Sequence, residues 1–173
     1  MFFLGCEWNP RIFNVDIKMF LYIVGAVYLQ INILSAIEYQ CISLNIEKPT
    51  IALQIYSSLF TFFLFEYLYF EEIHLYTYDL FAEKVGFKLI WGCLFFYPFF
   101  YCVGIHCIVS TRNDIQPMTA FVICMVYMLG WIITRGANLQ KYYYKRNPKN
   151  KYVFFNCMEQ RHLPKHPKIL GTW

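Results

Sequence analysis

The residues with the clearest capacity for binding chemistry lie together near the end of the last long apolar run. Arg135, Asn138, Lys141 and Lys145 recur there at intervals of three or four residues, with Gln140 among them. On a helix that turns 100° per residue, Asn138, Lys141 and Lys145 fall within about 60° of one another, with Arg135 at the edge. Lysine and arginine offer positive charge and several donors, so this cationic stripe predicts a site for an anionic group such as a phosphate.

Two further polar side chains lie within the apolar runs. Glu66 is near the end of the second run, and His106 is in the third. An acid close to a membrane boundary is most often interfacial, although an intramembrane acid is a site hypothesis by default. A lone histidine on a helix is usually satisfied by a neighbouring group, so His106 is interpreted as structural first and catalytic second.

The elements that must position these residues are four long apolar runs. The chain has 173 residues, of which 58% are hydrophobic and only 15% charged, whereas soluble domains are about 45–50% apolar. The runs cover approximately residues 19–39, 50–70, 86–110 and 117–146, and each is long enough to cross a bilayer core of about 30 Å. We therefore predict an all-α, polytopic membrane protein with about four transmembrane helices in this chain.

The distribution of positive charge predicts the orientation of these helices. Nine of the fifteen Lys and Arg residues lie from Arg135 to Lys168, against the single acid Glu159. The positive-inside rule places this basic segment in the cytosol, together with the loop at 71–85, and it is sufficient to explain the charge. The basic segment is also compatible with anionic lipid, whereas nucleic-acid binding has no direct support.

Cysteine usage points away from disulfides and metals. The seven cysteines include no CxxC pair, and most lie inside apolar runs. Cysteine in such surroundings behaves as a small hydrophobic residue. We therefore expect neither a disulfide framework nor a zinc site.

Three motifs resemble signatures of the sterol reductase family. They occur in the order and spacing of that family, so the resemblance extends over nearly the whole chain. The family includes the delta-14 sterol reductases, the reductase-like domain of lamin B receptor and, as a near relative, the delta-7 sterol reductases. The motifs are FFLGCEWNPRI at 2–12 with Asp16 and Lys18, YDLFAEKVGFKLIWG at 78–92 with Pro98, and RGANLQK at 135–141 with KRNP at 145–148.

The resemblance implies a protein of about ten helices in the endoplasmic reticulum or inner nuclear membrane. It implies NADPH-dependent reduction of a ring double bond, delta-14 or delta-7, in a sterol intermediate. Lys141 and Lys145 match family positions that contact the phosphates of the cofactor, and Asn138, Gln140 and Arg135 belong to the same motif. No metal is implied, and the oligomeric state is left open.

Three residues are candidates for the proton donor of such a reaction. They are Glu83, Tyr78 and Glu66, because a tyrosine, or a carboxylic acid with a raised pKa, can deliver a proton to carbon.

The sequence departs from the family pattern in two ways. The family usually has Gly-Asp where this chain has Gly92-Cys93, and cysteine cannot replace a carboxylate as an acceptor. In addition, we expect the chain to be an internal fragment or a truncated member of the family. Residues 1–148 are then part of a transmembrane domain, and the basic cytosolic segment 149–173 leads into a missing C-terminal half. Alone, it is expected to bind cofactor poorly and to be inactive.

Two other readings compete with an enzyme. The first is a non-enzymatic membrane protein of the nuclear envelope or endoplasmic reticulum, similar to lamin B receptor, or an inactive remnant, and Cys93 favours it. The second is a channel or transporter subunit, which would require charged residues at the centres of the spans. The centres of the four runs are apolar, so this reading ranks last.

Overall fold

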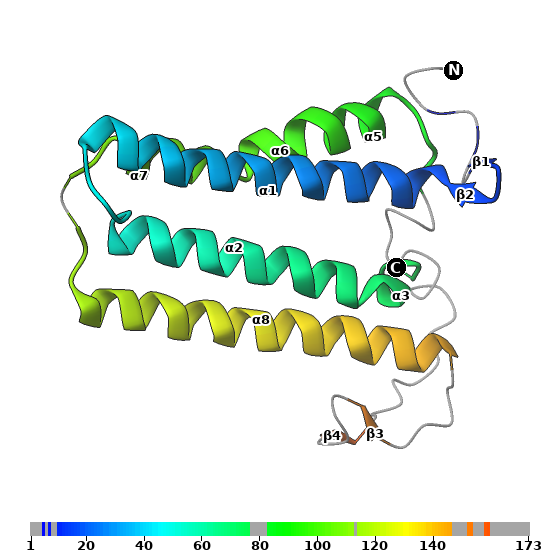
Figure 1. Cartoon of the computed structure of the whole chain (residues 1–173). Helices are drawn as coiled ribbons and strands as arrows, with labels where there is room; N and C mark the ends of the chain where they lie inside the picture. Colours follow the sequence, from blue (N-terminus) through cyan, green and yellow to red (C-terminus); the bar gives the residue numbers. More distant parts are fainter. Residues whose placement is uncertain are drawn as a thin grey trace.

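The computed structural model describes Gly5, Glu7 and residues 10–76, 83–112, 114–146, 152–153 and 158–159. Three long helices, α1 (Ile17–Leu44), α2 (Ile51–Tyr69) and α8 (Pro117–Arg146), are joined by a fourth, segmented span (Figure 1). That span consists of α5 (Phe87–Trp91), η1 (Gly92–Phe96), α6 (Tyr97–Phe100) and α7 (Val103–Val109). All four are long and apolar enough to cross a membrane. The predicted all-α, polytopic fold class is confirmed, whereas the division at residue 148 stays a prediction.

Short elements lie at the ends of the long helices. Helix α3 (Glu71–His74) follows α2 directly. Strands β1 (Arg11–Ile12) and β2 (Val15–Asp16) form one antiparallel pair before α1, and β3 (Tyr152–Val153) and β4 (Met158–Glu159) form another after α8. These pairs are two residues long and contribute no sheet layer.

Helix α2 lies between α1 and α8, and the segmented span packs along α1 (Figure 1). The start of α1, helix α3 and the end of α8 lie at one end of the bundle, and the connections after α1 and α7 lie at the other. The basic end of α8 is therefore on the same side as the α2–α3 junction. This arrangement brings the described parts of the first and third motifs towards one membrane surface.

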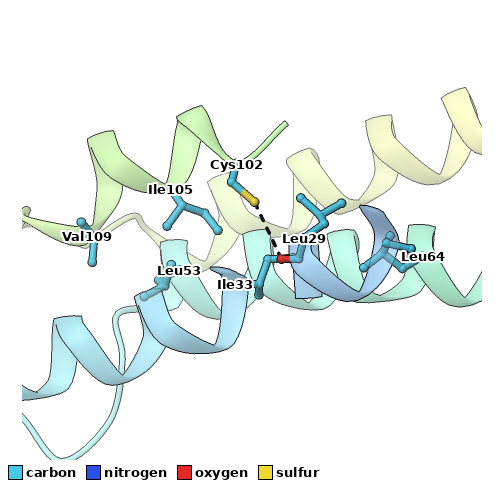
Figure 2. Close-up of a cluster of buried hydrophobic side chains, with 8 residues drawn as sticks. Leu29, Ile33, Leu53, Leu64, Cys102, Ile105 and Val109 are labelled. Atoms are coloured by element: carbon cyan, nitrogen blue, oxygen red, sulfur yellow. Dashed lines mark hydrogen bonds between the residues drawn. The ribbon is translucent and has the colours of Figure 1, made fainter. Parts of the chain in front are cut away.

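The main core lies where α1, α2 and α7 meet (Figure 2). Ala26, Leu29 and Ile33 of α1 recur at intervals of three and four residues, so they share one helix face. Leu53 and Ile105 pack against that face, and both are almost fully buried. The thiol of Cys102 lies 3.9 Å from the carbonyl oxygen of Leu29, which confirms that this cysteine is a packing residue.

Local polar residues begin and end α1. The carboxylate of Asp16 accepts hydrogen bonds from the backbone N–H groups of Lys18 (3.0 Å) and Met19 (3.2 Å), as an N-cap residue does. At the other end Asn45 adopts a left-handed conformation (φ 52°, ψ 53°), and its N–H caps the carbonyls of Cys41 and Ile42. Asparagine tolerates this conformation better than most residues, so the helix stops there.

Helix α2 is capped by a residue that is distant in sequence. Thr50 makes no side-chain cap bond; instead the Asp114 carboxylate accepts from the N–H groups of Ile51 (2.7 Å) and Ala52 (3.0 Å). Burial would raise the pKa of Asp114, but these two bonds and a third from Ile115 lower it overall. The connection before α8 is therefore tied to the start of α2.

The third span contains one π-helical turn, η1, just before Pro98. Proline has no N–H to donate, and its ring crowds the preceding turn. The chain accommodates it by widening: the N–H of Tyr97 reaches the carbonyl of Gly92, five residues back. Asn32 of α1 donates to the carbonyl oxygen of Pro98 (3.2 Å), so a neighbouring helix satisfies a backbone acceptor beside this interruption.

Candidate functional site

The cationic stripe of α8 divides between the interior and the surface. Arg135 is buried, Asn138 and Lys141 are half-buried, and Gln140 and Lys145 are exposed. The buried face at this end of α8 consists of Arg135, Leu139 and Tyr142, which recur at intervals of four and three residues. The side chain that the helical wheel places at the edge of the stripe thus points towards α2.

Arg135 finds its partner at the end of α2. Its Nη2 forms an ion pair with Oε1 of Glu66, and the two side chains are only 5% and 6% exposed. The guanidinium carbon also lies 4.4 Å from the centroid of the Phe70 ring, a cation–π contact. The Glu66 carboxylate thus anchors Arg135 in the structure, and its assignment as a proton donor stays a prediction.

His74 closes the same corner. Helix α3 is held against α8 by the packing of Ile73 on Leu139 and Tyr142, and this places the His74 ring 3.8 Å from that of Tyr67 in a stacked arrangement. Burial, and secondarily the charge of Arg135, lowers the pKa of His74 from 6.5 to about 4, against the opposing effect of the Tyr67 carbonyl. His74 is therefore neutral at physiological pH.

These groups line a cavity of about 520 Å³ between α2, α3 and α8. Its walls are aromatic at one end and polar at the other. The residues are Phe63, Glu66, Tyr67, His74, Tyr127, Gly130, Trp131, Thr134, Arg135 and Asn138. We call it the α2–α8 cavity. Along α8 its lining runs from Tyr127 and Trp131, within the span, to Asn138, one turn before Lys141.

A second cavity, of about 280 Å³, adjoins the first on the other side of α2. The two share Phe63 and Tyr67. Glu83 lines the second cavity and pairs with Lys88 (2.7 Å). Cys93 and several tyrosines complete its wall: Tyr22, Tyr67, Tyr97 and Tyr101. We call it the Glu83 cavity.

Of the other sequence-predicted residues, none that the structure describes lines these two cavities. Tyr78 lies outside the described residues. His106 is exposed on α7 and lines a separate cavity of about 620 Å³ towards the opposite end of the bundle. At the surface near α3, Glu72 accepts hydrogen bonds from Tyr142 (2.8 Å) and Arg146 (3.1 Å). These two hydrogen bonds hold the end of α8 against α3.

Sequence reasoning missed Trp131, Tyr67 and His74 as members of the site. Trp131 precedes Arg135 by four residues, so one helix face carries both, and this spacing was the available signal. Tyr67 directly follows Glu66, but nothing in the sequence indicates that it faces two cavities. His74 is placed by the docking of α3, a tertiary contact without a sequence pattern.

Comparisons with known proteins give a consistent result. A profile of the Ergosterol biosynthesis ERG4/ERG24 family matches residues 1–162. The Delta(14)-sterol reductase of Arabidopsis thaliana is 30% identical over 146 residues, which are 84% of this chain and 38% of that protein. The Delta(14)-sterol reductase of Methylotuvimicrobium alcaliphilum is 31% identical over 155 residues, 88% of this chain and 35% of that protein. The Delta(14)-sterol reductase LBR of Gallus gallus is 30% identical over 99% of this chain and 27% of its own length. This chain thus spans roughly a third of the length of these relatives.

Proposed function

Because the chain belongs to the Ergosterol biosynthesis ERG4/ERG24 family, as its three motifs indicate, we propose that it forms part of a membrane sterol reductase. The reaction is the NADPH-dependent reduction of a ring double bond in a sterol intermediate during sterol biosynthesis. The delta-14 bond is favoured over delta-7 by the names of the three relatives. The setting is the endoplasmic reticulum or inner nuclear membrane, with the end of α8 in the cytosol.

One observation carries the proposal beyond the family match. The α2–α8 cavity runs from an aromatic end within the span to a polar end beside the basic end of α8. A flat apolar sterol fits among aromatic side chains, and a polyanionic dinucleotide requires the wet, cationic side. The cavity joins these two environments on one helix, as a reductase site in a membrane requires.

The described residues fit a nicotinamide dinucleotide in their donor chemistry. Asn138 is half-buried at the polar end of the cavity, and Lys141 and Lys145 lie further along the same helix face. We assign the two lysines to the phosphates and place Asn138, Gln140 and Arg135 in the surrounding wall. The cofactor supplies hydride, and the protein must supply a proton to the other carbon.

For the proton donor we favour Glu83 over Glu66. Glu66 is committed to a buried ion pair with Arg135, whereas the partner of Glu83 is Lys88, whose side chain is 82% exposed, so solvent screens this pair. Glu83 also lines a cavity that shares Tyr67 with the α2–α8 cavity. Tyr78 stays a candidate from the sequence alone.

Lysine substitutions test the proposed function directly. In the longest natural form of the protein, reconstituted in nanodiscs, Lys141→Gln and Lys145→Gln should each raise the KM for NADPH about tenfold or more, because each removes a charge-assisted bond to phosphate. Turnover of a delta-14 sterol is followed by gas chromatography. Lys48→Gln is the matched control, since Lys48 is exposed at the opposite end of the bundle. If no delta-14 or delta-7 sterol is reduced although NADPH binds, the enzymatic proposal fails.

A second candidate function rests on Cys93. This residue lines the Glu83 cavity and is only 3% exposed, at the position where the family pattern has an aspartate. A missing carboxylate in that wall favours a non-enzymatic membrane protein of the nuclear envelope or endoplasmic reticulum. Cys93→Asp distinguishes the two. A rise in sterol turnover shows that cysteine costs activity, whereas unchanged turnover in an active protein removes the support for the second candidate.

A further inference from the structure

Two side chains that line the α2–α8 cavity carry buried donors that no described residue accepts. The Nε and Nη1 atoms of Arg135 are buried and lack a hydrogen-bond partner among the described residues, and so does Nε1 of Trp131. Arg135 as a whole is only 5% exposed. Burying a donor without a partner is energetically costly, so the presence of these donors on a cavity wall points to a ligand atom.

The charge of the cavity restricts the chemistry of that atom. The positive charge of Arg135 is balanced by Glu66. The other basic residue in the lining is His74, which is neutral at physiological pH. The cavity therefore has no net charge to offer a phosphate, although it has N–H groups to spare. A doubly charged group would lose its hydration there without a counter-charge.

The position of the two residues makes a single subsite. Trp131 and Arg135 are four residues apart on α8, so their side chains lie on one face of the helix. Thr134 and Asn138 line the cavity on either side of Arg135 along the chain. The ion pair with Glu66 and the contact with the Phe70 ring hold the guanidinium in place. The remaining edge of the guanidinium is thus fixed before any ligand arrives.

We propose that Arg135 and Trp131 form a subsite for an uncharged oxygen acceptor, a hydroxyl or carboxamide oxygen, and not for phosphate. This inference rests on the proposed reductase function, which offers two sources of such an oxygen. A sterol carries a single hydroxyl at its polar end, and a nicotinamide carries a carboxamide. The subsite separates the role of Arg135 from that of Lys141 and Lys145 within the same motif.

The test uses two mild substitutions and two pairs of probes. Trp131→Phe removes one N–H and keeps an aromatic ring, and Arg135→Lys keeps the charge opposite Glu66 but loses the planar set of donors. Binding is measured in nanodiscs with two pairs of probes. Cholestanol and cholestane differ only in the hydroxyl, and NADPH is compared with 2′-phospho-ADP-ribose, which keeps all the phosphates and both riboses and lacks the nicotinamide. Trp91→Phe is the matched control, because Trp91 is 41% exposed on α5 and lines neither the α2–α8 cavity nor the Glu83 cavity.

Each variant should weaken one member of one pair by about three- to tenfold, the effect of losing one or two hydrogen bonds. Weaker binding of cholestanol with unchanged binding of cholestane identifies the sterol hydroxyl. Weaker binding of NADPH with unchanged binding of 2′-phospho-ADP-ribose identifies the carboxamide. The subsite is refuted if Arg135→Lys weakens the binding of 2′-phospho-ADP-ribose, if the binding of both sterols weakens equally, or if neither variant changes any affinity. Should the wild type bind neither sterol nor NADPH, the reductase proposal itself fails and the subsite with it.

Discussion

At the scale of single residues, the corner formed by Glu66, His74 and Arg135 shows how the interior of the bundle treats charge. The acid and the base are paired, and the histidine is kept neutral by burial and by the neighbouring guanidinium. Breaking such a pair leaves an uncompensated buried charge, which costs about 3–5 kcal/mol. The cluster is therefore expected to be sensitive to single substitutions and insensitive to pH above neutrality.

The lowered pKa of His74 predicts how stability depends on pH. The unfolded chain takes up a proton near pH 6.5, whereas the folded chain does so only near pH 4, so folding stability is full above about pH 6.5 and falls as the pH drops towards 4. At about 1.4 kcal/mol per pKa unit the full shift corresponds to about 3 kcal/mol. Screening by solvent reduces this effect, so we expect a loss of about 1–2 kcal/mol, or several degrees in Tm. His74→Gln should flatten this dependence in thermal unfolding in detergent.

His106→Gln serves as the control for that measurement, because His106 is exposed on α7. Its Tm should fall with pH as steeply as that of the wild type. A His74→Gln protein that retains the full slope would show that another group is responsible.

At the scale of elements, α1 packs closely against η1 at a glycine. Gly25 of α1 faces the backbone of the π-turn: an added Cβ would clash with the carbonyl oxygen of Cys93 and lie 2.9 Å from Cδ1 of Tyr97. Backbone atoms cannot move aside as a flexible side chain can. The absence of a side chain at Gly25 therefore allows η1 to pack closely on α1. Cys93 of η1 is thereby held in the wall of the Glu83 cavity.

Gly25→Ala should consequently destabilise the protein by about 1–3 kcal/mol, as overpacking does. Gly130→Ala is the matched control, because an added Cβ there meets nothing within 4 Å, and alanine favours a helix over glycine by up to about 1 kcal/mol. Thermal unfolding of both variants in the same detergent measures the difference. Equal midpoints would contradict the close packing of α1 on η1.

Much of the element scale could be predicted from sequence, and much of the site could not. Four helices follow from the lengths of the apolar runs, because a bilayer imposes about 20 residues per crossing. The burial of Arg135 against α2 could not be predicted from sequence. A helical wheel groups the polar residues on one face, but it does not show whether that face meets water or another helix. In a membrane the polar side chain turns inward, and its partner Glu66 lies on another helix. Pro98 is compatible with an interrupted span, but the sequence does not predict the π-turn that accommodates it.

At the scale of the whole molecule, the exposed surface of the bundle is apolar along its spans. The outward residues of α8 include Phe121, Val122, Val126, Leu129 and Ile133. In a bilayer such a surface contacts acyl chains or further helices without cost. The polar residues are concentrated inside, around the two cavities, and at the ends. This distribution of apolar and polar side chains is that of a membrane protein.

The proposed orientation can be checked by labelling in sealed vesicles. Arg146 and Lys48 are exposed at opposite ends of the bundle, and the positive-inside rule puts Arg146 in the cytosol. In vesicles with the cytosolic face outward, an impermeant maleimide should label Arg146→Cys at once, above the background of the native cysteines. Lys48→Cys should be labelled only after permeabilisation. The reverse pattern would invert the topology.

The π-turn at η1 also bears on how this span tolerates changes in length. Each residue of an α-helix adds a rotation of 100°. The wider π-turn accommodates one additional residue, so the later helices α6 and α7 are not rotated by the full 100° that this residue would otherwise add. Deleting one residue from Gly92–Phe96 would turn α6 and α7 relative to α1, and it would separate Asn32 from Pro98 and Cys102 from Leu29. Among homologues, insertions and deletions in this span should therefore fall at residues 92–96, and those that do should be matched by changes on the facing side of α1.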